Sequence, residues 1–142
     1  MTPNERKPWG GADVLEDATR VHRVLKYPSC ISKKDGKVNR KVFLRKLDEQ
    51  DGLSVTNPLI CTPEQVCATF SECFGTVTLQ VGQIRGLGLD VIPDTEPSDE
   101  YPCDHALIIG LPPRDTDQNI YIAESLANKL TSICEDLIIV NP

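Results

Sequence analysis

Residues 105–140 read HALIIGLPPRDTDQNIYIAESLANKLTSICEDLIIV, and this stretch decides the predicted fold class. Residues 106–109 form a continuous apolar run, which is typical of a strand in the middle of a sheet. Apolar side chains then recur on one face of a helix, at Ala123, Leu126, Ala127, Leu130, Ile133 and Cys134. Residues 137–140 form a second apolar strand. This order predicts a β-α-β unit and a mixed sheet.

Shorter elements are predicted upstream, with strands over residues 53–55, 76–81 and 87–92 and helices over residues 39–49 and 63–75. Thr62 is the expected cap of the second helix, Pro63 its first residue and Gly75 its end.

Residues 12–27 fit two structures. The first half is predicted as a helix, because Val14, Leu15 and Ala18 recur at helical spacing. The second half is left open, since residues 19–27 also fit a strand. Residues 1–11 are predicted as a loose N-terminal tail that Trp9 pins to the body. Residues 12–142 are predicted as a single globular domain of the α/β (mixed α+β) class, with about four to six short strands and three or four helices.

The composition bounds the class of protein. The chain has 142 residues, 39% of them hydrophobic, which is enough for one core. No apolar run reaches the ~18 residues of a membrane span. The N-terminus lacks an apolar signal region, so a cytoplasmic location without membrane partners is predicted.

The six cysteines are predicted to be reduced and buried. Cys61, Cys67 and Cys73 recur every six residues, so they would not share one helix face. The sequence contains no CxxC motif, and no metal site is predicted. No phosphate-binding glycine motif is present, so no cofactor is predicted either.

Charge is distributed unevenly in this acidic chain of net charge −6. Ten of the fifteen Lys and Arg residues lie between Arg20 and Lys46, with Asp35 as the single acid there. Candidate anion-binding residues are Arg20, Arg23, Lys26, Lys33, Lys34, Lys37, Arg40, Lys41, Arg45 and Lys46. A solvated face is one interpretation of the segment. Docking to an acidic protein or to this chain's own acidic half is another, and nucleic-acid binding is a third, which the scarcity of aromatic residues disfavours.

Three residues are candidates for chemistry. His105 begins an apolar strand, where a histidine can act as a general base. Arg23 and Ser54 complete the set, Ser54 as a strand hydroxyl and Arg23 as an anion ligand. The competing interpretations are that His105 caps its strand by hydrogen bonding and that Arg23 is a surface group.

Two stretches resemble a family of small uncharacterised bacterial proteins. Phe43 followed by Asp51-Gly52-Leu53-Ser54-Val55 is similar to the family's "F, short spacer, D-G-x-S-V" stretch. Residues 102–110, PCDHALIIG, are similar to its "P-x-H-A-x-I-x-G" stretch, with two residues before His105 where the family usually has one. The family has no established activity. The resemblance implies an early extended strand that carries Arg20 or Arg23, and it permits a fold-level analogy with ADP-ribosyltransferase-like domains, whose first strand carries an Arg or His.

The leading functional prediction is a non-catalytic cytoplasmic accessory or interaction protein, because no phosphate loop, metal cluster or nucleophile–base pair is evident in the sequence. The first alternative is a small nucleotide- or RNA-directed enzyme, in which Arg23, Ser54 and His105 converge on one pocket. The second alternative is nucleic-acid binding through residues 20–46.

Overall fold

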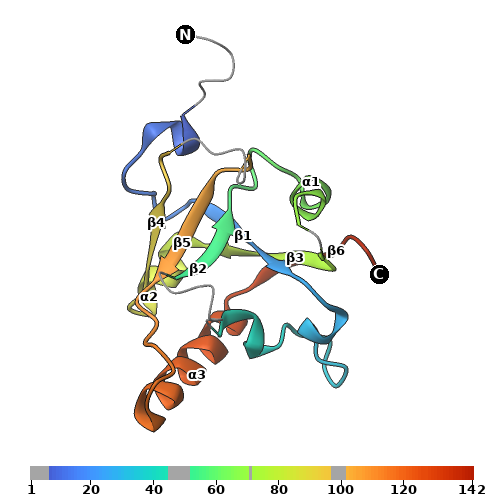
Figure 1. Cartoon of the computed structure of the whole chain (residues 1–142), viewed down its shortest axis with the longest axis vertical. Coiled ribbons are helices and arrows are strands. Elements are labelled where there is room, and N and C mark those ends of the chain that lie inside the picture. Colours follow the sequence, from blue (N-terminus) through green and yellow to red (C-terminus); the bar gives the residue numbers. More distant parts are fainter. Residues whose placement is uncertain (1–6, 45–51, 71, 97–101) are drawn as a thin grey trace.

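One antiparallel sheet organises the chain (Figure 1), in a computed structural model that describes residues 7–44, 52–70, 72–96 and 102–142. The strands are β1 (Arg20–Leu25), β2 (Leu53–Thr56), β3 (Gly75–Gln80), β4 (Asp90–Pro93), β5 (His105–Ile109) and β6 (Glu135–Ile139). Their order in the sheet is β4-β5-β2-β1-β3-β6. The α-helices are α1 (Pro63–Ala68), α2 (Val81–Gly86) and α3 (Asp117–Ser132), and the 3-10 turns are η1 (Pro8–Gly11), η2 (Pro28–Cys30) and η3 (Arg40–Phe43).

The fold is α+β, with the six strands and three α-helices of the described residues inside the predicted numbers. The prediction of a mixed sheet is wrong, because all hydrogen-bonded strand pairs found there are antiparallel. The strand–helix–strand order of β5, α3 and β6 is as expected. However, β2, β1 and β3 lie between the two strands, so they run in the same direction without pairing.

The prediction of a helix in the first half of residues 12–27 is also wrong. Residues 12–19 contain no helix, and the open second half forms strand β1. Val14 is 72% exposed, so the apolar residues at helical spacing do not share a buried face. Val21 and Leu25 are fully buried in β1, which pairs with β3 along its whole length. The secondary structure of this segment is therefore determined by its pairing with a strand distant in sequence. Local helix propensity does not determine it.

Other boundaries differ from the predictions. Helix α1 has the expected cap, since Thr62 and Gln65 bond each other's backbone N–H groups, but it ends at Ala68. Residues 81–86 form helix α2, which was not predicted. Of the predicted strand over 87–92, only residues 90–92 pair, as part of β4. The predicted helix over 39–49 is the 3-10 turn η3 in its described part, and residues 45–49 lie outside the described residues.

The two faces of the sheet carry different layers, and Figure 1 shows α1 and α3 on opposite sides. The main core lies towards α3, η3 and α2, and its fully buried members include Phe43, Leu79 and Leu130. A smaller cluster of Cys61, Val66 and Cys103 lies under α1. Val24 of β1 packs against this smaller cluster on the α1 side of the sheet.

The prediction of six reduced cysteines is wrong. Cys61 bonds Cys103, and Cys67 bonds Cys73, while Cys30 and Cys134 carry no disulfide. Cys61, Cys67 and Cys73 do not share one helix, because α1 contains only Cys67 and the chain folds back after it to bring Cys73 to Cys67. Disulfides persist in oxidising compartments, which argues against the predicted cytoplasmic location. Among the described helices, none is long and apolar enough to cross a membrane.

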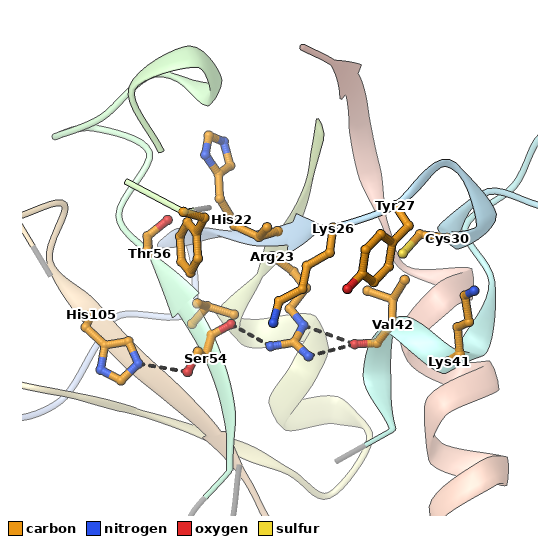
Figure 2. Close-up of a pocket in the computed structure, with 13 residues that line it drawn as sticks. His22, Arg23, Lys26, Tyr27, Cys30, Lys41, Val42, Ser54, Thr56 and His105 are labelled. Carbon is orange, nitrogen blue, oxygen red and sulfur yellow. Dashed lines mark hydrogen bonds between the residues drawn. The ribbon is translucent and has the colours of Figure 1, made fainter. Parts of the chain in front are cut away.

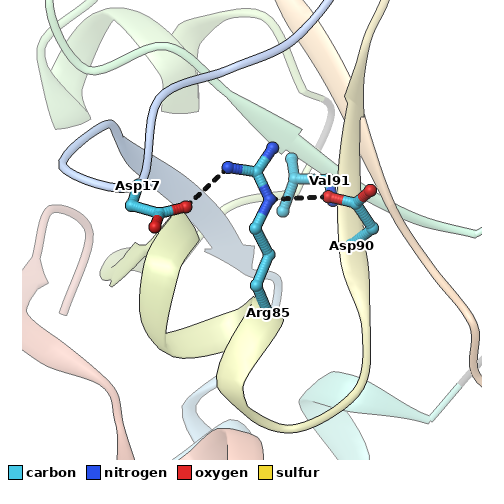
Figure 3. Close-up of polar contacts among 4 residues, drawn as sticks. All are labelled: Asp17, Arg85, Asp90 and Val91. Atoms are coloured by element: carbon cyan, nitrogen blue, oxygen red, sulfur yellow. Dashed lines mark hydrogen bonds and ion pairs between the residues drawn. The ribbon is translucent and has the colours of Figure 1, made fainter.

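Arg85 of α2 fixes the start of β4 (Figure 3). Its Nε lies 2.9 Å from Oδ1 of Asp90, and its Nη1 lies 2.7 Å from Oδ1 of Asp17. The Arg85 hydrogen bond, followed by the N–H of Val91, lowers the pKa of the Asp90 carboxyl. Arg85 thus links the start of β4 to α2 and to the segment before β1. Asp94 directly follows the last residue of β4.

Candidate functional site

Strands β1 and β2 pair at one position, His22 with Thr56, in the described chain. Antiparallel continuation would place Val24 opposite Ser54, but the guanidinium of Arg23 reaches Ser54 instead. Its Nη1 donates a 3.0 Å hydrogen bond to the carbonyl oxygen of Ser54. Its Nε and Nη2 donate to the carbonyl oxygen of Val42 at 3.0 and 2.8 Å. Arg23 therefore satisfies backbone acceptors in η3 and in β2.

A cavity of about 350 Å³ opens beside this junction (Figure 2). It is lined by His22, Arg23, Val24, Lys26, Tyr27, Cys30, Lys41, Val42, Ser54, Val55, Thr56, Phe70 and His105. The three predicted chemical residues, Arg23, Ser54 and His105, all lie in this set. The volume is within the range of small-molecule sites.

His105 and Ser54 contact each other directly in the cavity. Nε2 of His105 lies 3.1 Å from Oγ of Ser54 (Figure 2). On the other side of the ring, Nδ1 lies 3.8 Å from Oδ2 of Asp94. Asp94 is not among the site residues predicted from the sequence, because the acidic, proline-containing residues 94–104 are typical of a solubilising loop. Only the pairing of β4 with β5 brings Asp94 to the ring.

Both histidines of the cavity have a lowered pKa. Burial lowers the pKa of His105 below its usual 6.5, and the neighbouring Asp94 carboxylate opposes this shift only in part. Burial likewise lowers the pKa of His22, against the weaker opposing effect of Asp136. Both rings are therefore neutral at pH 7, which is the form that a general base needs.

The charged lining of the cavity is cationic. Arg23, Lys26 and Lys41 carry positive charge at neutral pH, and no carboxylate belongs to the described lining. In Figure 2, the Lys26 side chain points into the part of the cavity that holds the Arg23 guanidinium. The Lys41 ammonium lies 2.6 Å from the hydroxyl of Ser29 at the cavity's edge. Such a lining attracts an anionic ligand.

Two buried polar atoms of the lining have no hydrogen-bond partner in the described structure. They are Nδ1 of His22 and Oγ1 of Thr56, and each residue is 6% exposed. An unpartnered buried polar group costs about 1–3 kcal/mol. The paired positions of these residues put both groups on the same side of the sheet, where a ligand or water could satisfy them.

The start of β5 is held by the N-terminal turn. The backbone N–H of Trp9 donates to Oδ2 of Asp104, and its indole Nε1 donates to the carbonyl oxygen of His105, both at 2.9 Å. Trp9 thus pins residues 7–11 to the body. Asp104 itself has a left-handed backbone with φ of 58°, and its carboxylate also accepts from the amide of Asn57. This loop geometry explains why Asp94, and not the adjacent Asp104, lies beside Nδ1 of His105.

The remaining candidates are distributed over the surface. Arg20 pairs with Glu135 and Asp136, and Arg40 pairs with Glu124, so both contact this chain's own acidic half. Lys33, Lys34 and Lys37 are exposed around the Asp35-Gly36 turn, away from the cavity lining. Arg45 and Lys46 lie outside the described residues.

The described residues hold no group of three or more His, Cys, Asp or Glu side chains placed to bind a metal ion. In comparisons with known protein families, curated proteins and solved structures, no match to this chain is found. The chemistry of the cavity is therefore the basis for a functional proposal.

Proposed function

We propose that this protein is a small enzyme that binds a nucleotide, or a nucleotide at the end of an RNA, in the cavity beside β1 and β2. One observation carries the proposal: a His–Ser hydrogen-bonded pair lies in a cavity whose charged lining is cationic. A nucleophile or hydroxyl in contact with a neutral histidine is a common catalytic arrangement.

The lining matches the two parts of a nucleotide. Lys26, Lys41 and Arg23 supply positive charge for phosphate oxygens. Tyr27 and Phe70 supply aromatic faces, on which a base can stack. The unpartnered atoms of His22 and Thr56 are suited to hydroxyl or amide groups of the ligand.

The residues divide into two roles in this proposal. His105 takes or gives a proton through Nε2, and Ser54 holds the reacting atom or the ligand. Arg23 is chiefly a positioning residue, because its guanidinium donates hydrogen bonds to the backbone carbonyl groups of Val42 and Ser54. ADP-ribosyl transfer is the candidate reaction that the fold-level analogy suggests, because β1 carries both His22 and Arg23.

Binding can be tested with the chain's single tryptophan as reporter. Trp9 bonds the His105 carbonyl, so its fluorescence should respond to a ligand beside His105. We expect AMP, ADP and NAD⁺ to change the fluorescence saturably, and inorganic phosphate to compete. Replacing Lys26 and Lys41 together by alanine should weaken binding by about tenfold or more, as expected for two lost charge-assisted contacts.

The matched control replaces Lys33 and Lys34, which have the same charge but lie outside the cavity lining. That double variant should bind like the wild type. Equal weakening by both double variants would indicate a general charge effect and would contradict a site in the cavity. No saturable response to any of the nucleotides would also contradict the proposal.

A non-catalytic interaction protein remains the competing proposal. It is favoured by the exposed Lys33, Lys34 and Lys37 around one turn, which could contact an acidic partner. Affinity capture from native extract would support it if a stoichiometric partner were lost on replacing these lysines. Retention of the same partner by the lysine variant would count against it.

A further inference from the structure

We propose that Ser54 is a nucleophile that His105 activates, and that Asp94 is the positioning residue that orients the His105 ring. The proposal deepens the proposed function and rests on it, because the same cavity would deliver the substrate. The substrate class that it implies is a phosphorus ester, such as the phosphate linkage of a nucleotide.

The three side chains come from consecutive strands of the sheet. Asp94 follows β4, His105 begins β5 and Ser54 lies in β2, and these strands are neighbours in the order β4-β5-β2. The imidazole therefore lies between a carboxylate and a hydroxyl. The Nδ1–Oδ2 distance to Asp94 is 3.8 Å and the Nε2–Oγ distance to Ser54 is 3.1 Å.

The backbone holds this arrangement at several points. The N–H of Asp94 donates a 2.9 Å hydrogen bond to the carbonyl oxygen of His105. The same carbonyl accepts from the indole of Trp9. On the other side of the ring, Ser54 pairs with Leu107 of β5 and its own carbonyl is bonded by Arg23. The Asp94 carboxylate is thus held at the end of β4 and the Ser54 hydroxyl on β2, the two strands that flank β5.

The order of the groups determines what the ring can do. A carboxylate beside Nδ1 favours the tautomer that carries its proton there, which leaves Nε2 as the acceptor for the Ser54 hydroxyl. The Asp94 contact is longer than a hydrogen bond, and such contacts commonly tighten when substrate binds. A hydroxyl, a neutral histidine and a carboxylate in this sequence form the arrangement that activates serine on unrelated folds.

The chemical step balances without a further reactant. The Ser54 hydroxyl gives its proton to Nε2 of His105 as its oxygen forms a bond to phosphorus. The bond from phosphorus to the leaving oxygen breaks, and the His105 imidazolium returns the proton to that oxygen. Water then attacks phosphorus, giving its proton to His105, and the Ser54 oxygen departs with that proton. Lys26 and Arg23 lie on the same cavity, where positive charge stabilises the phosphoryl oxygens.

A purely structural interpretation of the Ser54–His105 bond makes a different prediction. If the bond only ties β2 to β5, the Ser54 oxygen has the low reactivity of an ordinary serine. An alkyl phosphonofluoridate probe separates the two cases, because the serine oxygen displaces fluoride from phosphorus in the same way. This reaction needs no nucleotide, so its failure is distinct from a failure of nucleotide binding.

The experiment treats the full chain with the probe and locates the label by peptide mass spectrometry. We expect one label, on Ser54, and none in Ser54→Ala. His105→Asn should lower the labelling rate by about 100-fold or more, the usual contribution of a general base. Asp94→Asn should lower it by about tenfold or more, and Asp94→Glu should restore part of the rate, since it keeps a carboxylate near Nδ1.

Ser125→Ala is the matched control, since Ser125 lies on α3 outside the cavity lining, and it should label like the wild type. Circular dichroism of each variant establishes that it is folded. No labelling of Ser54 in the folded wild type would overturn the proposal. Labelling of Ser54 that is unchanged in folded Asp94→Asn would overturn the role of Asp94. Nucleotide binding by folded Ser54→Ala would leave the proposed function standing in either case.

Discussion

Arg23 of β1 reaches Ser54 of β2 through a 3.0 Å hydrogen bond to its carbonyl oxygen, at the point where the two strands no longer pair. Arg23 is 8% exposed. Its buried guanidinium bonds the Ser54 carbonyl oxygen where no β1–β2 strand pair is formed. The cavity beside it exists because β1 and β2 pair at a single position. Arg23 therefore fixes the position of Ser54 in the candidate site.

The first prediction concerns the hydrogen bonds of the Arg23 guanidinium. Arg23→Lys keeps the positive charge, but an ammonium cannot bond the carbonyl groups of Val42 and Ser54 with the fork of a guanidinium. We expect the free energy of unfolding to fall by about 2–4 kcal/mol, measured by urea denaturation, because buried acceptors lose their donors.

Arg20→Lys is the control for that substitution. Arg20 lies on the same strand, its side chain is 53% exposed, and its ion pairs with Glu135 and Asp136 are on the surface. Its replacement should change the free energy of unfolding by less than about 0.5 kcal/mol. Equal losses of unfolding free energy in the two variants would show that the buried Arg23 contacts stabilise the fold no more than the surface ion pairs of Arg20.

The second prediction concerns pH. His22 and His105 have a lower pKa in the folded protein than the usual 6.5, because burial disfavours their protonated form. The unfolded chain therefore binds more protons near pH 6, and the stability that the neutral rings provide is lost as pH falls below about 6.5. Each histidine can contribute at most about 1.4 kcal/mol per pH unit.

Urea denaturation between pH 7.5 and 5.5 tests this expectation, above the range where ordinary carboxyl groups titrate. The double variant His22→Gln, His105→Gln should show a flatter dependence of the unfolding free energy on pH. A wild-type stability that rises as the pH falls through this window would contradict the predicted sign.

The third prediction concerns the disulfides. The Cys61–Cys103 bridge closes a loop of sequence separation 42, and the Cys67–Cys73 bridge one of separation 6. Loop entropy predicts losses of about 4 and about 2 kcal/mol when each cysteine pair is replaced by alanine. Non-reducing peptide mass spectrometry should find both bridges in the purified protein.

One of the two remaining thiols should resist modification. Burial raises the pKa of Cys134 to about 12, so iodoacetamide at pH 8 should modify Cys134 only after denaturation. Rapid modification of four further cysteines in the native protein would show that the bridges are absent. Equal stability losses in the two alanine pairs would contradict the loop argument.

Local signals in the sequence account for part of the fold. The cap at Thr62, the alternation along β3 and the apolar face of α3 depend on residues close in sequence, and these elements form near their predicted positions. The sequence does not predict strand β1 definitely, because this strand depends on pairing with β3, from Arg20 with Gln80 to Leu25 with Gly75.

The candidate site shows the same division. Ser54 and His105 were nominated from their positions in strands, yet their contact joins residues 51 apart in sequence. Asp94 could not be selected from an acidic, proline-broken loop, because only the β4–β5 register distinguishes it from its acidic neighbours. The disulfide pairs were missed for the same reason, since the fold decides which thiols meet.

A titration with ADP followed by ¹H–¹⁵N correlation NMR tests directly whether the cavity binds nucleotides. If the cavity binds nucleotides, the largest saturable shift changes should occur at the amides of His22, Ser54 and His105 and at the Trp9 indole. Residues 33–37 should shift little. Absence of shifts up to about 1 mM ADP, or the largest changes at residues 33–37, would contradict a nucleotide site in this cavity.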